Sequence, residues 1–454
     1  MIRVLHVSPT DLQGGACLGA YNLHKALQSA GLDSSMLVLR KFSDDPSVVQ
    51  LHRRLLGKMD ALRDPLDRLP LRRYRWDPSN WWSVGWLPFD LRRAVKKLKP
   101  DIIQFHWVGR GAVPIRALAR LSDYPLLWTL RDMWPLTGGC HYSGDCDRFA
   151  VGCGSCPQLG SSRPNDLSRW QWRSKERNWR DVRVTYIALS HWMAACARRS
   201  PLSRGNDIVI IPNGVDVRHF RPLDKAEARS AWKLPHDRLV ILFGALHAVR
   251  DPRKGFRYLA EAMKHLGDSG WGKRAIAVVF GAGDCSLDMG IPVRFVGSVP
   301  NAQLSQLYSA SDVMVVPSLF ENSAKTAIEA LACGVPVVAF GNTGQFDIVD
   351  HRVNGYLAQD RSSEDLARGI AWCLERGIGS SDLATQARTK ACTRFDLAEI
   401  AADHVRLYEG ILKGRTTVPE RIRPVPSWKG SLAGEVLAPL CEEPVLKISD
   451  GGAR

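Results

Sequence analysis

Two glutamates eight residues apart, Glu321 and Glu329, lie in the segment FENSAKTAIEALACGVPVV, residues 320–338. Glu321 follows an apolar run. Glu329 lies inside a helical pattern, about two turns further on at ~3.6 residues per turn, so both side chains point to a similar side. A carboxylate accepts hydrogen bonds from neighbouring hydroxyls, and the free amides at a helix start attract anions. The spacing therefore favours a ligand that carries both polyols and phosphate.

A second group of candidate residues lies in the basic loop GALHAVRDPRKGF, residues 244–256. Lys254 offers a compact positive charge for a pyrophosphate, and its neighbours Arg250 and Arg253 offer forked donors. The loop therefore predicts a diphosphate site, and an exposed basic loop without a ligand is the alternative.

Two glycines, Gly14 and Gly15, follow an apolar run at residues 2–8 and precede a helical pattern. Glycine at such a turn lets an anion approach the backbone where the helix amides point outward. The pair therefore indicates a ligand site at the first strand end, unless it serves only the packing of the turn.

Four cysteines lie in the short glycine-rich segment TGGCHYSGDCDRFAVGCGSCPQL, residues 137–159, and they are Cys140, Cys146, Cys153 and Cys156. Four thiols that end in a Cys-x2-Cys pair are typical of a structural zinc site. The alternatives are a loop of reduced cysteines or, in an oxidising compartment, two disulfides.

The chain is strongly basic, with a net charge of +16 and a pI of about 9.5 over 454 residues. Basic residues crowd residues 53–99, and four tryptophans lie among them, Trp76, Trp81, Trp82 and Trp86. This mixture suits the cytoplasmic, inner face of a membrane, and a solvated basic face with inward tryptophans is the alternative. Nucleic acid is not expected, because the charge follows no known module that reads it.

No apolar run reaches the ~18 residues that span a bilayer, and the N-terminus does not have the pattern of a signal peptide. We therefore expect a cytoplasmic protein, at most peripheral on the membrane. In that compartment the cysteines are expected to be thiols or metal ligands.

The elements that must position these residues are strands alternating with helices, which predicts two α/β domains built on parallel sheets. We expect an N-terminal domain over residues 1–205 and a second domain over residues 206–395. A helix at 396–413 is expected to pack back on the first domain. The proline-rich tail, residues 414–454, is expected to be disordered.

Together these segments resemble the retaining glycosyltransferases of family four, which have the GT-B fold of two Rossmann-like, doubly wound parallel-sheet domains facing a cleft. The resemblance covers roughly residues 1–413. It is carried by Gly14-Gly15, by IPNGVDVRHFRP (residues 211–222), by RKGF around Lys254, by PSLFENSAKTAIEALACGVPVV, and by the glycine loop with Gly344 that leads to NGYL.

The resemblance implies roles for individual residues. Glu321 would bind hydroxyls of the donor sugar, Glu329 the ribose hydroxyls, and Lys254 the diphosphate. The triplet Asn322-Ser323-Ala324 would face sugar and pyrophosphate, and Gly15 would contact phosphate from the opposite wall.

The sequence also departs from the family pattern. Ala245 stands where the family has an arginine, so Arg250 or Arg253 is the expected substitute. Arg131, before Asp132, stands where many relatives have a histidine, so an electrostatic role is expected for it. His106, at a strand end, is a further cleft candidate, with a structural role as the alternative.

The function that the resemblance implies is metal-independent, retaining transfer of a sugar from a GDP- or UDP-sugar to a lipid-linked or cell-surface polysaccharide precursor, such as exopolysaccharide or lipopolysaccharide. No catalytic cofactor is expected. The alternatives are a sugar-nucleotide 2-epimerase of the same fold and a nucleotide-sugar-binding partner without catalysis.

Overall fold

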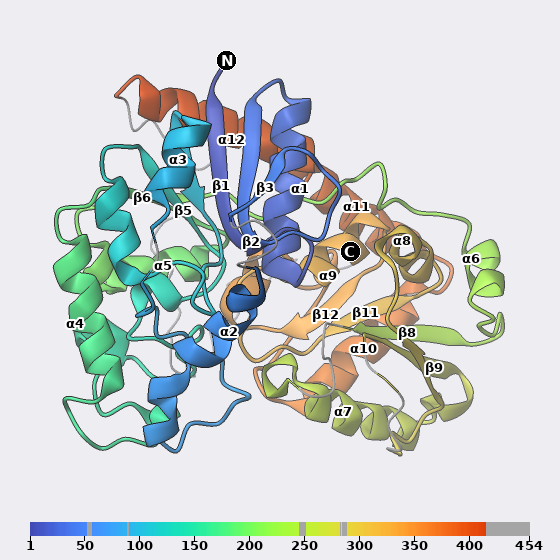
Figure 1. Ribbon diagram of the computed structural model, residues 1–454. Helices are drawn as coiled ribbons and strands as arrows, with labels where there is room; N and C mark the ends of the chain where they lie inside the picture. The colour runs from blue at the N-terminus through green and yellow to red at the C-terminus, as the bar shows by residue number, and fades with distance from the viewer. Residues whose placement is uncertain (52–56, 89, 245–250, 282, 284–287, 415–454) are drawn as a thin grey trace, which may run out of the picture.

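The computed structural model describes residues 1–414 except 52–56, 89, 245–250, 282 and 284–287. Two parallel β-sheets form the centres of two lobes (Figure 1). The first sheet contains, in spatial order, β3 (Val48–Gln50), β2 (Asp33–Arg40), β1 (Arg3–Thr10), β4 (Ile102–Phe105), β5 (Leu126–Leu130), β6 (Val184–Ala188) and β7 (Ile208–Ile210).

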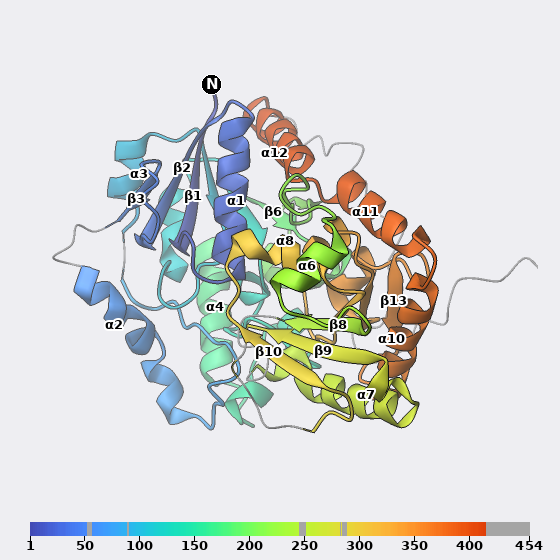
Figure 2. The same cartoon turned by 90° about the vertical axis from the view of Figure 1, so that its right-hand side faces the viewer.

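Helices cover both faces of the first sheet. Every residue of β4 and β5 is therefore buried, and these strands are mostly apolar throughout instead of alternating between apolar and polar residues. One face packs on α3 (Arg92–Leu98), α4 (Leu167–Trp179) and α5 (His191–Arg199). The other face packs on α1 (Gly15–Ser29) and α12 (Leu397–Leu412). The helix α2 (Gly57–Asp67) lies outside these layers, beside the sheet (Figure 2).

The second sheet contains, in spatial order, β10 (Val293–Gly297), β9 (Ala275–Phe280), β8 (Leu239–Gly244), β11 (Val313–Val316), β12 (Val337–Phe340) and β13 (Gly355–Ala358). One face packs on α6 (Lys225–Ala231), α8 (Asn301–Ser309), α9 (Lys325–Ala332) and α11 (Asp382–Arg394). The other packs on α7 (Phe256–Asp268) and α10 (Ser363–Gly377). The expected fold of two Rossmann-like parallel-sheet domains is confirmed.

In each sheet the strand order reverses once, between β1 and β4 and between β8 and β11. Ligands of open parallel sheets bind outside the carboxyl ends of the strands at such switch points. The candidate residues after β4, β8 and β11 therefore lie where this fold class places its chemistry.

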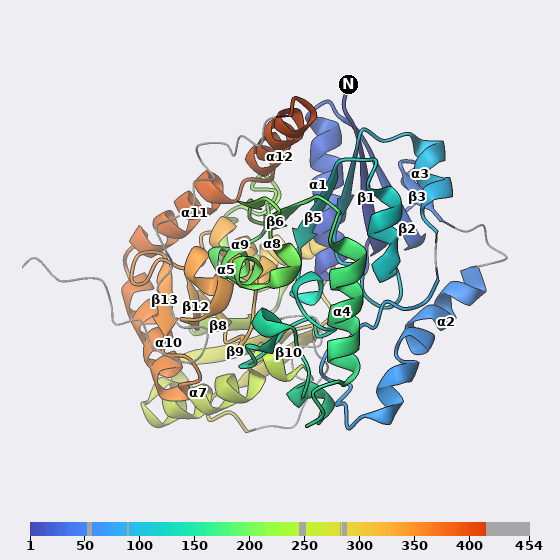
Figure 3. The ribbon, with the colours of Figure 1, turned by 90° about the vertical axis from the view of Figure 1, so that its left-hand side faces the viewer.

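The last helix, α12, returns to the first lobe, where it lies beside α1 (Figures 2 and 3). Ile400, Leu407 and Tyr408 pack with Leu23 and Leu27 of α1 in one buried cluster. The Tyr408 hydroxyl donates a hydrogen bond to Gln104 of β4. The chain thus crosses between the lobes twice. The expectation for residues 414–454 falls, apart from residue 414, outside the described residues.

One expectation about the elements was wrong, and one helix was not identified from the sequence. The boundary at residue 205 gave the strand after it to the second domain, but β7 pairs with β6 in the first sheet. The apolar run of β7 fits either sheet equally well, so only the pairing decides. The helix α11 was not expected, because it is polar and buries only Leu383, Ala387 and Ala391. In the part of the chain that the structure describes, no helix is long and apolar enough to cross a membrane.

Candidate active site

The wall of the second lobe is centred on an ion pair between Lys254 and Glu321, whose Nζ and Oε2 atoms lie 2.5 Å apart. Lys254 ends a short 3-10 helix, and the next residue, Gly255, has a φ of 69°. A Cβ atom on Gly255 would lie 1.8 Å from the carbonyl oxygen of Pro317, just after β11. Only glycine allows this close approach, which brings the lysine of one strand end to the glutamate of the next.

The backbone that carries Glu321 is held from the neighbouring strand end. The Gly344 N–H donates to the Glu321 carbonyl oxygen at 2.9 Å. A Cβ atom on Gly344 would lie 1.7 Å from the Asn322 carbonyl oxygen, so the two segments approach closely through their backbones here, and the Thr343 hydroxyl accepts from the Glu321 N–H at 3.2 Å. Gly344 therefore lies directly beside the site residues, as a support for their backbone.

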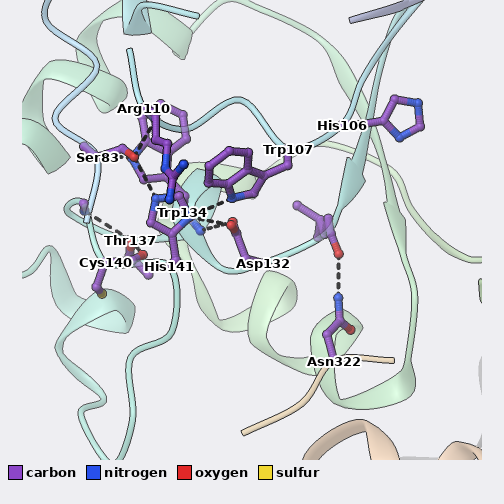
Figure 4. A network of polar contacts seen from close by, with 12 residues as sticks. Ser83, His106, Trp107, Arg110, Asp132, Trp134, Thr137, Cys140, His141 and Asn322 are labelled. Atoms are coloured by element: carbon purple, nitrogen blue, oxygen red, sulfur yellow. Dashed lines mark hydrogen bonds and ion pairs between the residues drawn. The ribbon is translucent and has the colours of Figure 1, made fainter. Parts of the chain in front are cut away.

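Asn322 joins the two lobes. Its side-chain amide donates to the Leu130 carbonyl oxygen of β5 at 2.7 Å (Figure 4). Its side-chain oxygen accepts from the Ser190 hydroxyl at 2.8 Å. Its side chain is buried, so both polar atoms serve the interface rather than an open pocket. Beside it, the Ser323 carbonyl oxygen accepts from Asn213, and Ala324 is the N-cap residue of α9 without a side-chain cap.

Glu329 lies on α9 in the interior of the second lobe. Its Oε2 accepts from the Tyr308 hydroxyl at 2.9 Å, and its Oε1 lies 3.0 Å from Lys325 Nζ without forming an aligned hydrogen bond. A buried carboxylate oxygen with unused acceptor capacity is able to take a ligand hydroxyl. No direct contact joins Glu329 to Glu321 among the described residues.

The wall of the first lobe contains a buried polar network at the end of β5 (Figure 4). Asp132 accepts from the Trp134 backbone N–H at 2.9 Å, and its Oδ2 lies 2.5 Å from His141 Nδ1. His141 Nε2 lies 2.8 Å from the Ser83 hydroxyl oxygen, which accepts from the Arg110 N–H.

The chemistry of these groups assigns the protons. The carboxylate of Asp132 only accepts, so Nδ1 of His141 carries a proton; in the neutral ring, Nε2 then accepts from the Ser83 hydroxyl. Trp107 Nε1 is 3.1 Å from the same Nδ1. Since an indole only donates, it cannot bond to a protonated Nδ1, and its contact is one of packing. In this state each oxygen of Asp132 accepts one hydrogen bond from within the first lobe, and the side chain holds the loop that follows β5.

Arg131 points the other way from Asp132, toward the segment that links the lobes. Its guanidinium donates to Asn213, and a Cβ atom on Gly19 of α1 would lie 2.6 Å from it. Burial lowers the pKa of Arg131 to about 10, so the group stays charged at neutral pH. Arg131 and Asn213 thus connect the end of β5 to Ser323 of the other lobe.

His106 is fully buried and stacks on His6, with 2.9 Å between His106 Nε2 and His6 Nδ1. Burial, followed by the charge of Arg131, holds the pKa of His106 well below its usual range. The structure therefore places His106 as a neutral group in the interior, where it supports Arg131 from behind.

The remaining expected residues lie at the edges of this site. Gly14 is the N-cap of α1 with a φ of 83°, and Cβ atoms on Gly14 or Gly15 would meet open space. Arg253 is held by Asp251, and Arg250 lies outside the described residues, as does Ala245.

The four cysteines of the segment 137–159 (Cys140, Cys146, Cys153 and Cys156) are free thiols. Burial raises the pKa of Cys153 to about 12 and of Cys156 to about 11, because it disfavours the thiolate. Across the described ranges, no three His, Cys, Asp or Glu side chains are grouped so as to hold a metal ion. The side chains as arranged therefore do not fit the zinc site, which stays a prediction to be tested by metal analysis of the purified protein.

A cavity of about 420 Å³ lies away from these residues, between α9, α10 and α11, with Cys333, Leu383 and Arg388 in its lining. The Arg388 guanidinium donates to the carbonyl oxygens of Val217, Phe220 and Ala332. None of the candidate site residues that the structure describes lines this cavity.

Three residues of this arrangement were missed from the sequence, namely Ser83, His141 and Asn213. His141 lies nine residues after Asp132, a separation that matches neither a helix face nor a strand face. Only Asn213 had a signal, because it belongs to the quoted segment IPNGVDVRHFRP.

Comparisons with known proteins bear on the whole arrangement. The family model for glycosyltransferase family 4 matches residues 13–219, and the model for glycosyl transferases group 1 matches residues 237–376. A D-inositol 3-phosphate glycosyltransferase of Thermobispora bispora is 25% identical over 446 residues, covering 91% of this chain and 95% of that protein. One from Catenulispora acidiphila is 34% identical over 209 residues, 43% of this chain and 48% of that protein.

Solved structures share the fold. Sucrose-phosphate synthase from Thermosynechococcus elongatus superposes with a TM-score of 0.65 at 21% identity, covering 91% of this chain and 100% of that chain. Anabaena HepE in complex with UDP-glucose superposes with a TM-score of 0.59 at 18% identity, over 91% and 100% of the two chains. The chain therefore belongs to the group 1 glycosyl transferases of family 4 and is a glycosyltransferase with the GT-B fold.

Proposed function

We propose that this glycosyltransferase moves a sugar from a nucleotide-sugar donor to a lipid-linked or cell-surface polysaccharide precursor, with retention of anomeric configuration and without a catalytic metal. The observation that carries the proposal is the Lys254–Glu321 pair at the switch point of the second sheet. HepE, a neighbour in fold, was solved with UDP-glucose, which supports a donor of that class.

The two charges of the pair serve different parts of the donor. Lys254 stabilises the diphosphate, whose negative charge grows as the bond to the sugar breaks. Glu321 accepts hydrogen bonds from sugar hydroxyls. In the absence of donor, each neutralises the other. The leaving diphosphate oxygen takes the proton of the acceptor hydroxyl, so the reaction needs no protein base, which agrees with the bonding of both Asp132 oxygens within the first lobe.

The test is product stereochemistry. Incubation with labelled UDP- and GDP-sugars and a lipid extract is expected to move label to lipid, and NMR is expected to show the anomeric configuration of the donor. Activity in EDTA is expected to equal activity in buffer. An inverted product, or loss of activity in EDTA that Mg²⁺ restores, contradicts the mechanism.

The same experiment separates the two other candidate functions. A free nucleotide-sugar whose sugar has changed configuration at C2 favours the epimerase. Binding of nucleotide-sugar without any turnover favours a non-catalytic partner.

A surface on the first lobe supports a lipid-linked acceptor. We name it the α2 patch, and it consists of the exposed residues Leu62, Leu66, Leu69, Arg72, Arg73, Arg75 and Trp86. Exposed leucines and a tryptophan beside arginines suit a layer of anionic headgroups, which attract the cations while the apolar side chains enter the interface.

Vesicle sedimentation tests this surface. The protein is expected to bind vesicles with phosphatidylglycerol and not vesicles of phosphatidylcholine alone, and Leu62→Ser with Leu66→Ser is expected to weaken binding. Ile378→Ser is the matched control, because Ile378 and Leu62 are each 56% exposed and Ile378 lies on the other lobe. Equal binding by the patch variant and the control contradicts membrane contact through the α2 patch.

A further inference from the structure

The segment Cys140–Cys146, which we name the bridging loop, crosses from the first lobe to the second. Its base is anchored in the first lobe, where Cys140 forms an isolated antiparallel bridge with Trp82. The His141 N–H donates to the Trp81 carbonyl oxygen at 3.0 Å, and the His141 side chain contacts Asp132 and Ser83. The start of the loop therefore has a defined position on the wall of the first lobe.

The next residues of the loop contact the second lobe. The guanidinium carbon of Arg253 lies 4.8 Å from the centre of the Tyr142 ring. Three residues later, Asp145 forms an ion pair with Arg361 at 2.9 Å. The loop thus turns His141 toward one wall and Tyr142 toward the other.

Tyr142 is held in position by contacts with the first lobe. Its ring stacks on Trp192 of α5, with an interplanar angle of 10°, and its carbonyl oxygen accepts from Gln158 at 2.6 Å. Burial raises the pKa of the Tyr142 phenol, and the charge of Glu321 raises it further, so the neutral ring lies in the electrostatic reach of the Lys254–Glu321 pair.

The guanidinium of Arg253 is fixed on two sides. Its Nε and Nη2 atoms donate to Asp251 at 3.1 and 2.6 Å, and its face lies on the Tyr142 ring. Within the described residues, Nη1 has no hydrogen-bond partner. Arg253 directly precedes Lys254, so the remaining donor belongs to the same 3-10 helix as the lysine of the ion pair.

We infer that Tyr142 is a positioning residue of the donor site, supplied by the opposite lobe, which holds Arg253 so that its unused Nη1 donates to the diphosphate of the nucleotide. A cation over an aromatic face is attracted by the ring quadrupole, and the planar guanidinium is thereby oriented. The inference rests on the proposed function, because it needs a diphosphate ligand.

A second role, as simple adhesion between the lobes, makes a different prediction. Adhesion would change the binding of every nucleoside ligand alike, because each depends on the same closed arrangement. Positioning of Arg253 affects only ligands with a diphosphate. The phenol hydroxyl is not needed for positioning, since the ring face makes the contact with Arg253.

The experiment measures binding of UDP, UMP, GDP and GMP to the full chain by calorimetry, for wild type, Tyr142→Phe, Tyr142→Ala, Arg253→Gln and the Tyr142→Ala/Arg253→Gln double variant. Tyr142→Ala is expected to weaken binding of the preferred diphosphate about tenfold, a magnitude within the range of buried cation–π contacts, and to leave the monophosphate within twofold. Tyr142→Phe is expected to behave as wild type. The double variant is expected to bind no more weakly than Arg253→Gln.

Asp145→Asn, in the same loop, is the matched control and is expected to bind as wild type.

Three results overturn the inference: an equal loss of monophosphate and diphosphate affinity in Tyr142→Ala, unchanged diphosphate affinity, or additive losses in the double variant. A wild-type chain that binds neither UDP nor GDP contradicts the proposed function itself, and the inference falls with it.

Discussion

The site residues of the two lobes differ in what they are bonded to. On the second lobe, Lys254 and Glu321 are partly exposed and pair with each other. On the first lobe, Asp132 and His141 are buried and bonded to Trp134 and Ser83 as well as to each other. A charged side chain that pairs only with another residue of the site can exchange that partner for a ligand. A buried side chain that is hydrogen-bonded to the surrounding structure instead holds that structure in place. The comparison assigns chemistry to one wall and positioning to the other.

The largest effect is expected from the second lobe. Lys254→Ala and Glu321→Ala are each expected to lower kcat/KM about 10- to 100-fold, since a hydrogen bond to a charged group contributes about 1.5–3 kcal/mol. Thermal unfolding is expected to change little, because the pair is partly exposed. Steady-state kinetics measure the change, with the nucleotide-sugar that the transfer assay identifies as the donor.

Lys264→Ala, at an exposed lysine of α7, is the control and is expected to be fully active. Full activity of Lys254→Ala would remove the assignment of chemistry to this wall.

The first lobe is expected to respond in stability. Asp132→Asn keeps the shape but loses the charge-assisted bond to His141, so the free energy of unfolding is expected to fall by about 1.5–3 kcal/mol. Urea denaturation measures it, with Asp123→Asn at an exposed turn as the control. Wild-type stability together with a hundredfold loss of turnover would instead make Asp132 a catalytic residue and reverse the comparison.

The free energy of unfolding is expected to depend on pH through a buried lysine of the first lobe. Lys175 is buried beneath the loop after β5, where it donates to the Thr137 carbonyl oxygen at 3.0 Å, and burial lowers its pKa to about 7. The unfolded lysine titrates near 10.5, so between these values the unfolded state binds the extra proton and stability rises with pH. Relative to Lys175→Met, the wild type is expected to gain about 1–2 kcal/mol between pH 7 and 8.5.

Denaturant unfolding of both proteins at the two pH values measures that difference, and the comparison cancels the titration of the cysteines. A wild type whose stability relative to Lys175→Met stays the same at the two pH values would show that Lys175 is charged in the folded protein as well.

The smallest effect is expected where the walls meet at the surface. Asp145 and Arg361 are 66% and 38% exposed, so Asp145→Asn is expected to cost about 1 kcal/mol or less and to matter less still in high salt. Denaturation at low and high salt measures this. A loss above ~2 kcal/mol would make the ion pair, rather than Asn322, the main link between the lobes.

Much of the fold follows from local pattern. Apolar runs such as that of β11, alternating with helical patterns, indicate parallel sheets covered on both faces, and the strand ends then identify Lys254 and Glu321. The helix α11 escaped because its buried residues are mostly alanines, which add little apolar signal. The strand β7 was assigned to the wrong sheet, because three apolar residues do not say which neighbour they pair with.

The residues at which the two lobes meet were hidden for another reason. Asn322 was expected to bind the substrate, but its two side-chain polar atoms bond to Leu130 and Ser190 of the first lobe. His141 and Tyr142 lie in a loop without periodicity, so nothing local says that one turns to Asp132 and the other to Arg253.

The sequence by itself determined the fold class and the charged residues of the second lobe, because strand periodicity and strand-end chemistry act over a few residues. Only the tertiary structure decided which polar side chains pair solely with each other and which are also bonded to the surrounding structure. It also decided that the bridging loop contacts the second lobe. The physical reason is that hydrogen-bond partners and burial depend on segments as far apart as Leu130 and Asn322, whose encounter no local pattern encodes.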